Sequence, residues 1–408
     1  MIQLFALGEV ATINPDTSIP FCADDLCSFV PMDAIDEATA EINRLATRPY
    51  KDVAKGYTSF RENDVLLAKI TPCMENGKCA IARGLRNGIG FGSTEFHVVR
   101  VSQQILPEWI YFYWRFPRTR ALAERSMTGT AGQKRVPTSF LELLPIPTPS
   151  IDKQRDLTRL LQKADELCRM RRYAVELSDV VLPATFLELF GNHFNKGASR
   201  PLGELVKITG GGTPSRDRPE FFQGRIPWLT AKDMRGDYIW DTEEHITEDA
   251  IENSATNLVP ANSILVVVKS KVLMHRLPVA IAKVPMCHGQ DIKSIQCLEG
   301  LHHEFARFVL KHHEGHLLNI ARGANTEGLT LPMLEGLPVP KVEFSEQRQF
   351  AALVARHEQL RATHVEALRQ AEHLFQTLLQ QVFSPEQAAS AWEQEKAPRV
   401  AGLERTTS

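Results

Sequence analysis

Apolar residues recur at every seventh position in two long stretches of this chain. The eight positions that keep this spacing are Leu160, Leu167, Ala174, Val181, Leu353, Leu360, Ala367 and Leu374. A heptad repeat sustained over four heptads predicts a helix that packs along an apolar seam, as in a coiled coil. We therefore predict two long helices, over residues 150–192 and 343–383, with these eight side chains forming the seam of an antiparallel pair.

The two stretches belong to a longer internal repeat. Gln154 recurs as Gln347 and Phe190 as Phe383, both at an offset of 193 residues (347 − 154). Immediately upstream, LELLPIPTP at residues 141–149 matches LEGLPVPKV at residues 334–342 at the same offset. Self-similarity at a fixed period is the mark of a duplicated architecture. The chain is thus predicted to consist of two halves related by a pseudo-two-fold repeat.

A globular part precedes the helix in each half. Short β-like runs alternate with glycine and proline punctuation, and one apolar helical segment follows them. The proline-rich segments between globular part and helix are predicted to be extended, because proline cannot continue a helix. We expect two α/β (α+β) domains in tandem, over residues 1–149 and 193–342, and a frayed or disordered tail over residues 384–408.

Composition narrows the possible classes of protein only slightly. The 408 residues are 43% hydrophobic and 24% charged, which is enough for two or three ordinary cores. The formal charge of −2 neither supports nor excludes a nucleic-acid partner, because net charge averages over faces. The 7 cysteines have no pairing logic, and neither a leader peptide nor a membrane span is recognisable. We therefore expect a reduced, cytoplasmic protein.

Catalytic motifs are missing from the sequence. There is no phosphate-binding G-x-x-x-x-G-K-[ST] loop, no dinucleotide fingerprint and no tetrapeptide of the kind that amino-methyltransferases use to hold the target amine. The histidine-rich stretch at residues 302–316 lacks cysteines or carboxylates at a repeated ligand spacing, which favours a solvated helix face over a zinc site. We expect no catalytic residues and no metal or cofactor of its own in this chain.

Several loops have the composition of phosphate and base contacts. TGTAGQKR at residues 128–135 and IARGANTEG at residues 320–328 occupy the same place in the repeat, and TGGGTPSRDR at residues 209–218 is a further cluster. Glycines let a backbone approach a ligand, and the neighbouring side chains donate hydrogen bonds to phosphates or base edges. Ordinary solvated loops are the alternative interpretation. The candidate residues are Gln133, Lys134, Arg135, Arg216, Arg218, Lys232, Lys269, Lys271, Arg322 and Asn325.

Together these segments resemble the specificity (S) subunits of type I restriction-modification systems. The resemblance rests on TGGGTPSR with WLTAKDM (residues 228–234), on the two domain exits GQKRVPTSFLELLPIPTPSIDKQRDL and GLTLPMLEGLPVPKVEFSEQRQF, and on the helix ends LPATFLELFGN and LFQTLLQQVF. It covers both halves in the order that the family requires. The first domain departs from the pattern, because PDTSIP at residues 15–20 replaces the GGGTPS loop.

The resemblance implies a non-catalytic subunit whose two globular domains are target recognition domains. Each would bind one half of a split, asymmetric double-stranded DNA target, and the helices would set the half-site spacing. Two modification (M) subunits would dock on the chain and methylate adenine with S-adenosylmethionine. Two restriction (R) subunits that use ATP and Mg²⁺ would complete the nuclease. These cofactors would belong to the other subunits.

Two other hypotheses remain at this point. A coiled-coil scaffold with two carbohydrate- or protein-binding modules predicts no salt-dependent affinity for DNA. A stand-alone methyltransferase or nuclease is opposed by the missing motifs, and an activity of the purified chain with cofactor alone would revive it.

Overall fold

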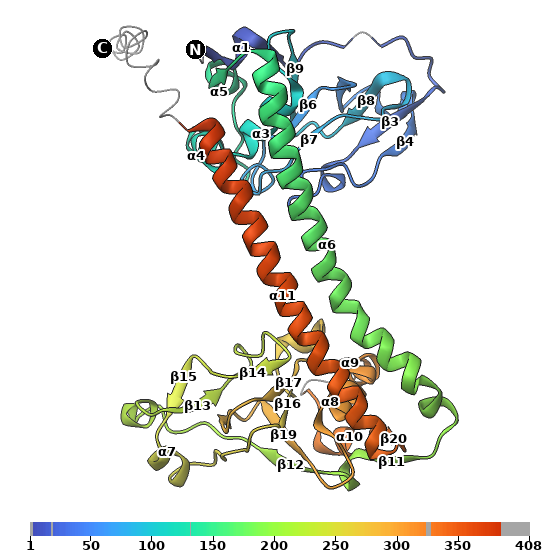
Figure 1. The fold of residues 1–408 in the computed structure, drawn as a ribbon, viewed down its shortest axis with the longest axis vertical. Helices are drawn as coiled ribbons and strands as arrows, with labels where there is room; N and C mark the ends of the chain where they lie inside the picture. Colours follow the sequence, from blue (N-terminus) through green and yellow to red (C-terminus); the bar gives the residue numbers. More distant parts are fainter. Residues whose placement is uncertain (1–2, 18, 131, 324–327, 385–408) are drawn as a thin grey trace. The chain divides into compact units, whose positions relative to one another are not determined.

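The computed structural model describes residues 3–17, 19–130, 132–323 and 328–384. The chain divides into two compact units, each with parts of both long helices (Figure 1). Unit 1 comprises the described residues up to 174 and from 364 onward, and unit 2 comprises those of 175–363. Among the described helices, none combines the length and the apolar character needed to cross a membrane.

Unit 1 contains two four-stranded sheets and a short strand pair. The first sheet has the order β2-β9-β6-β7 and the second the order β4-β3-β8-β5, while β1 pairs with β10. Five short helices accompany the sheets: α1 (Leu7–Val10), α2 (Tyr50–Val53), α3 (Pro107–Arg115), α4 (Pro117–Ser126) and α5 (Thr138–Leu143). The strands are β1 (Gln3–Ala6), β2 (Ala11–Ile13), β3 (Leu26–Val30), β4 (Ala46–Pro49), β5 (Thr58–Arg61), β6 (Val65–Ala68), β7 (Cys79–Ile81), β8 (Ile89–Gly92), β9 (Phe96–Val101) and β10 (Pro145–Thr148).

Unit 2 repeats this topology with different strand neighbours at the sheet edges. Its first sheet has the order β12-β19-β16-β17-β14, its second the order β15-β13-β18, and β11 pairs with β20. Its helices are α7 (Glu248–Glu252), α8 (His303–His312), α9 (Glu314–Gly323) and α10 (Leu331–Glu335). The strands are β11 (Ser199–Pro201), β12 (Val206–Gly210), β13 (Ile226–Leu229), β14 (Tyr238–Ile239), β15 (Glu244–Ile246), β16 (Ile264–Val267), β17 (Val279–Ala282), β18 (Cys287–His288), β19 (Ile292–Cys297) and β20 (Pro338–Pro340).

The internal repeat is therefore visible in the strand pairing itself. The first sheet of unit 2 has the neighbours β12, β19, β16 and β17 in the order in which unit 1 has β2, β9, β6 and β7. In the second sheets, β13 and β3 each have one antiparallel and one parallel neighbour. The two proline-rich exits are extended, as their proline content predicts, and they pair with β1 and β11 as strands β10 and β20. The prediction of two duplicated α/β (α+β) domains is confirmed.

Two long helices follow the domains, α6 (Ile151–Lys196) and α11 (Phe344–Phe383). In unit 1, Leu161 and Cys168 of α6 share a core with Phe375 and Leu379 of α11 and with α3. In unit 2, Phe186 of α6 packs against α8 and against Phe350 of α11, with ring centroids 5.4 Å apart. Each core therefore lies between a sheet, one short apolar helix and the long helices.

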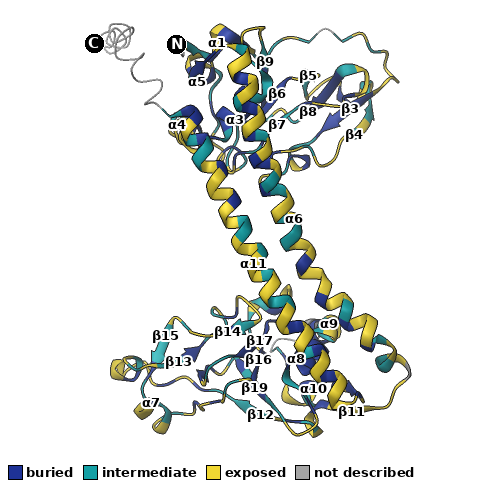
Figure 2. Ribbon diagram, in the orientation of Figure 1, coloured by how far each residue is buried: buried dark blue, intermediate teal, exposed yellow. Residues whose placement is uncertain are grey.

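The predicted apolar seam is wrong in its positions. Five of its eight residues have 41–54% of their surface exposed, namely Leu160, Val181, Leu353, Leu360 and Leu374. Leu167, Ala174 and Ala367 are half-buried. The buried positions lie one residue later, at Leu161, Leu182, Val354 and Phe375. Figure 2 colours both long helices by burial. A heptad count detects periodicity, whereas packing against the globular domain selects which face of the helix is buried.

The helices also contact each other through charged side chains. In unit 1, Arg172 of α6 donates to Glu372 of α11 at 2.7 Å, and there the two helices run in opposite directions (Figure 1). In unit 2, Arg361 donates to Asp179 at 2.6 Å. Each of these four side chains is at least a quarter exposed, so the ion pairs add little to the stability of the fold. Their main effect is to fix how the two helices are aligned.

A repeated glutamine joins each domain to its long helix. Gln154 accepts a hydrogen bond from the Leu106 amide and donates to the Gln104 and Pro149 carbonyls. In unit 2, Gln347 accepts from the His302 amide at 2.9 Å and donates to the Gly300 and Val342 carbonyls. Both glutamines are fully or almost fully buried. The glutamine at this repeated position thus joins the domain to the long helix through three hydrogen bonds, and we call it the glutamine clamp.

Replacing this clamp in unit 2 is expected to destabilise that unit by about 2–4 kcal/mol. Gln347→Leu leaves the His302 amide and the Val342 carbonyl without this partner, and each unsatisfied buried group costs roughly 1–3 kcal/mol, whereas the carbonyl of the exposed Gly300 can bind water. Hydrogen exchange followed by mass spectrometry should show faster exchange over residues 300–310. Gln359→Leu, at an exposed position of the same helix, should leave exchange unchanged. Equal protection in both variants would contradict the clamp.

Candidate nucleic-acid interface

Several strand ends meet at one edge of unit 2. The end of β12 pairs with the start of β19 (Gly210 with Lys293), and the end of β16 pairs beside it (Val267 with Ile292). The second sheet also ends at this edge. Gly289, which follows β18, donates its amide to the carbonyl of Leu229, the last residue of β13, at 2.9 Å. We call the residues 210–212, 229–234, 267–271 and 288–293 the unit 2 edge. Loops at the strand ends of a rigid scaffold are where binding residues are commonly found.

Four lysines belong to the unit 2 edge. Lys232, Lys269 and Lys271 were predicted from the sequence, and Lys293 was not. The three predicted lysines are exposed and Lys293 is half-buried. Among the described residues, none of the four forms an ion pair with a carboxylate. Ammonium groups that form no ion pair are available to phosphates.

Hydrogen bonds hold the lysine-bearing segments together. The Lys269 amide donates to the Asp291 carbonyl at 3.3 Å, and the Ser270 hydroxyl accepts from the Val272 amide to begin the turn at Lys271. The Arg276 guanidinium donates to the Met234 carbonyl at 3.0 Å, which ties this turn to the segment of Lys232. Sequence reasoning missed Lys293 because it lies inside a strand and only the strand pairing brings it beside Gly210.

The glycines of the TGGGTPSR loop do not open space for a ligand. A Cβ at Gly211 would lie 2.1 Å from the His288 carbonyl oxygen, and one at Gly212 would lie 2.6 Å from the Ala255 carbonyl carbon. These contacts are closer than any side chain permits, so the two glycines let the loop pack on the protein's own backbone. The expectation that they admit a ligand is therefore corrected.

The arginines after this loop are engaged inside the domain. Arg216 donates to Glu244 at 2.8 Å and lies over the Phe222 ring, 4.2 Å from its centroid. This hydrogen bond lowers the pKa of Glu244. Arg218 donates to Glu220 at 2.8 Å and to Asp249 at 3.1 Å. Both guanidinium groups have carboxylate partners, so a phosphate would have to compete with these carboxylates, and the contact of Arg216 and Arg218 with DNA stays a prediction.

The chain returns to the unit 2 edge after α9. The Leu329 amide donates to the Val268 carbonyl at 2.7 Å, and Gly328 has a positive φ of 88° next to it. A Cβ at Gly328 would lie 2.0 Å from the Val268 carbonyl oxygen, which requires glycine there. Arg322 belongs to α9, and the predicted contact Asn325 lies outside the described residues. Their assignment to the interface remains a prediction.

Unit 1 has the corresponding edge, with different side chains. The Val136 amide donates to the Lys69 carbonyl at 2.9 Å, in the position that Leu329 and Val268 occupy in unit 2. Gln133 and Lys134 are exposed beside it, in a loop closed by the bridge between Thr128 and Arg135. Lys69 is a further cation here that sequence reasoning missed.

Arg135 is less available than its position in the sequence suggests. Its guanidinium donates to both carboxylate oxygens of Glu95, with distances of 2.8 and 2.9 Å. These hydrogen bonds hold the pKa of Glu95 below its usual range. Gln133 and Lys134 therefore remain as the exposed predicted donors of this loop.

A buried histidine supports the unit 1 edge. His97 contacts the Val136 carbonyl through Nε2 at 2.8 Å, and its Nδ1 lies 3.1 Å from the Asn14 amide nitrogen. Burial lowers the pKa of His97, so the neutral ring donates to Val136 and accepts from Asn14. Lys293 occupies in unit 2 the position that His97 occupies in unit 1. His97 of β9 pairs with Leu67 of β6, and Lys293 of β19 pairs with Val266 of β16, the strand that corresponds to β6. The two edges thus differ in chemistry as well as in charge.

Comparison with known proteins finds similar sequences for the second half of the chain. Residues 197–371 match the model of the type I restriction modification DNA specificity domain. The type I restriction enzyme EcoEI specificity subunit of Escherichia coli is 40% identical over 167 residues, which are 41% of this chain and 28% of that subunit. The EcoR124I/EcoR124II specificity subunit of Escherichia coli is 33% identical over 172 residues, 41% of this chain and 43% of that subunit. The matches thus span less than half of these relatives.

Solved structures share the fold over nearly the whole chain. A chain from a study of complex assembly and conformational transition of the type I R-M system has a TM-score of 0.58 at 20% identity, covering 93% of this chain and 96% of that chain. The S subunit of a type I restriction-modification system from M. genitalium has a TM-score of 0.57 at 14% identity, covering 94% of this chain and 96% of that chain. These similarities establish the fold.

Proposed function

Because residues 197–371 match the family of type I restriction-modification DNA specificity domains, we propose that this chain is the specificity subunit of a type I restriction-modification complex. The observation that carries the proposal is the match of this domain together with its repetition in unit 1, where the order and direction of the strands recur. In this function each unit binds one half of a split, asymmetric DNA target. The long helices set the distance between the half-sites.

The divergence of the two edges supports a split target with unlike halves. The unit 2 edge carries four lysines without carboxylate partners among the described residues, whereas the unit 1 edge carries Lys69, Lys134 and the Arg135–Glu95 pair. Phosphate contacts by lysine position a protein on DNA, and base-edge contacts distinguish sequences by roughly 1–3 kcal/mol each. Unlike donors at equivalent places would read unlike bases.

Catalysis belongs to other subunits in this proposal. Two modification subunits that use S-adenosylmethionine dock on the chain and methylate adenine in each half-site. Two restriction subunits that use ATP and Mg²⁺ join them to form the nuclease. The chain itself contributes recognition and holds no cofactor.

Methylome sequencing tests the proposal directly. A restriction-deficient host would carry this gene with the modification subunit encoded beside it, and the control host would lack this gene alone. The expected result is a new bipartite motif with methyladenine in both halves. An assembled complex that produces no new methylated motif would contradict the proposal and favour a scaffold with other ligands.

Removing two lysines from the unit 2 edge is expected to reduce the salt dependence of DNA binding. Each lost phosphate contact lowers the slope of log K against log salt by about 0.9, so Lys269→Ala with Lys271→Ala should lower it by about 2. The measurement is fluorescence anisotropy with a random-sequence duplex at several salt concentrations. The matched control replaces the exposed Lys207 and Lys341, which lie outside the edge, and should leave the slope near that of the wild type. Equal slopes for the two double variants would remove these lysines from the interface.

A further inference from the structure

The first glycine of the TGGGTPSR loop differs from the two that follow it. A Cβ at Gly210 would lie 3.0 Å from the ammonium nitrogen of Lys293, and apart from the chain neighbours of Gly210 no other atom lies within 4 Å of that position. Gly211 and Gly212, by contrast, are packed on backbone atoms of the domain. The missing side chain of Gly210 therefore leaves room for one group, the ammonium group of Lys293.

Strand pairing fixes Lys293 at this place. Lys293 of β19 pairs with Gly210, the last residue of β12, on one side and with Val266 of β16 on the other. The Asn257 side chain donates to the Gly210 carbonyl at 3.0 Å, which holds the end of β12. Lys293 is half-buried, so neighbouring groups cover part of its methylene stem. A side chain that is held in this way loses less freedom on binding than a fully exposed lysine does.

The ammonium group of Lys293 is available to a ligand. Among the described residues it forms neither an ion pair nor a hydrogen bond. Its neighbour His288 is fully buried, and burial together with the charge of Lys293 lowers the pKa of that ring, so His288 is neutral. The space over Gly210 is otherwise open, so a ligand can approach this ammonium group.

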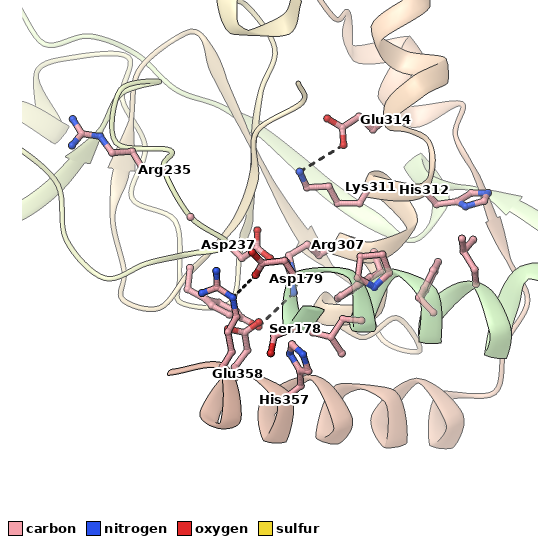
Figure 3. A pocket seen from close by; sticks show the side chains of 18 of the residues that line it. Ser178, Asp179, Arg235, Asp237, Arg307, Lys311, His312, Glu314, His357 and Glu358 are labelled. Carbon is pink, nitrogen blue, oxygen red and sulfur yellow. Dashed lines mark hydrogen bonds and ion pairs between the residues drawn. The ribbon is translucent and has the colours of Figure 1, made fainter. Parts of the chain in front are cut away.

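A cavity of unit 2 shows the more usual arrangement, in which cations have carboxylate partners. This cavity has a volume of about 960 Å³ and is lined by α6, α8 and α11. Figure 3 shows Arg307 beside Asp237, with which it forms an ion pair, and Lys311 beside Glu314, at 3.8 Å. These cations are engaged inside the protein, in contrast to Lys293.

The equivalent position of unit 1 has a side chain whose nitrogens are already bonded. Strand pairing places His97 there. Its Nε2 donates to the Val136 carbonyl at 2.8 Å, and its Nδ1 accepts from the Asn14 side chain at 3.1 Å. Both ring nitrogens are thus used within the domain, and the position that carries a free cation in unit 2 is closed in unit 1.

This difference distinguishes Lys293 from the exposed lysines of the two edges. Exposed lysines are present in both units, at Lys134 in unit 1 and at Lys269 in unit 2. Phosphate contacts carry no sequence information, so both units need them, whereas base contacts must differ between the units if the half-sites differ. The position occupied by Lys293 and His97 differs between the units in this way, which favours a base contact at Lys293.

We propose that Lys293 recognises a guanine in the half-site of unit 2 by donating to its N7 and O6 atoms in the major groove. Lysine only donates hydrogen bonds, and guanine is the base that presents two neighbouring acceptors on this groove edge. Adenine and cytosine each present a donor there, and thymine presents one acceptor beside its methyl group. The exposed lysines of the unit 2 edge bind phosphates around this contact. The inference rests on the proposed function, because it requires that unit 2 binds DNA.

The test measures methylation by the complex of the full chain with the modification subunit. The substrates are duplexes with the wild-type motif and duplexes in which one base pair of the motif is replaced. The wild-type complex should prefer guanine at one position of one half-site by about tenfold or more, and Lys293→Met should lose this preference. Methionine keeps most of the length of the side chain and removes its charge, so the preferences at all other positions should remain.

A second variant keeps the charge and moves it. Gly210→Val fills the space in which the ammonium group lies, and a β-branched residue is favourable in a strand. This variant should lose the preference for the same guanine. The control is Lys207→Met, at an exposed position of the same strand outside the unit 2 edge, and it should keep every preference within twofold. Circular dichroism should show that all three variants are folded.

A modified base identifies the atom that is contacted. 7-Deazaguanine keeps the base pair but lacks the N7 acceptor. At the recognised position it should slow methylation by the wild-type complex about fivefold or more, and it should leave the rate of the Lys293→Met complex unchanged. An equal effect on both complexes would contradict a contact between Lys293 and N7.

Each outcome of the methylation assay decides a separate point. Unchanged preferences in Lys293→Met would overturn the inference and leave the proposed function standing. A rate that falls equally on every duplex would make Lys293 a phosphate contact and overturn base recognition. Loss of a preference at an A·T pair would overturn guanine as the recognised base. Absence of any sequence-specific methylation by the assembled wild-type complex would overturn both the inference and the proposed function.

Discussion

Lengthening both long helices by four residues is expected to abolish methylation at the natural target. The insertions, Ala-Glu-Ala-Lys after Ala174 and after Thr363, fall where the chain passes from one unit to the other. Four helical residues add about 6 Å and a net turn of about 40°. Since DNA rises about 3.4 Å per base pair, the half-sites would have to be nearly two base pairs further apart.

The size of the effect follows from bivalent binding. Two recognition units on a rigid connection bind the second half-site as an intramolecular event, and losing that geometry costs a factor of about 10² to 10⁴ in affinity. Methylome sequencing of cells with the lengthened chain should show loss of the original motif, and any new motif should contain the same half-sites with a longer gap. Unaltered methylation would refute the role of the helices as a spacer.

A matched insertion separates spacing from general damage. The same four residues placed after Gly56 enter an exposed turn, where the backbone has a positive φ of 80° and open space around it. This chain should methylate the original motif. If it fails as well, loss of methylation in the helix variant cannot be attributed to the gap.

Removing the buried arginine of unit 2 is expected to cost about 3–5 kcal/mol of stability. Arg307 is 2% exposed, pairs with Asp237 and Glu304, and stacks on Phe308 at 4.7 Å from the ring centroid. Arg307→Met keeps the length and the apolar contacts but leaves the Glu304 carboxylate, itself 6% exposed, without this partner. Breaking one side of a buried pair is costly because the remaining charge has lost its solvation. Urea unfolding should show the loss as a lower midpoint for unit 2.

The double variant Arg307→Met with Glu304→Gln is the control. It removes both buried charges, and the amide oxygen that replaces the carboxylate would still accept from Tyr238, which donates to Glu304 at 2.9 Å in the wild type. Most of the lost stability should return. A double variant as unstable as the single one would show that the guanidinium contributes by packing and not by its charge.

Sequence reasoning succeeded where chemistry repeats along the chain. The 193-residue offset correctly predicted two domains of one topology, and the proline-rich exits were correctly predicted to be extended, as β10 and β20 are. Lys269 and Lys271, which the sequence analysis named, follow an aliphatic strand and lie at the unit 2 edge, and their contact with DNA stays a prediction. These features depend on local pattern and on connectivity, and both can be read from consecutive residues.

Sequence reasoning did not identify the interaction partners that come from distant segments of the chain. Arg216 resembles a phosphate donor until β15 brings Glu244 to it, and Lys293 resembles an ordinary strand residue until β12 places Gly210 beside it. A charge in a loop is a free donor only if no carboxylate folds against it. That information depends on pairing between strands far apart in the chain.

Repetition along the chain was enough to establish that it has two homologous halves, that each ends in a long helix, and that Gln154 and Gln347 hold equivalent places. These conclusions need only the residue pattern and the backbone limits of proline. Three-dimensional packing was required to show which face of each helix is buried and which cations at the edges have no ion pair among the described residues. Burial and charge compensation are set by neighbours in space, and the spacing of residues along the chain does not specify those neighbours.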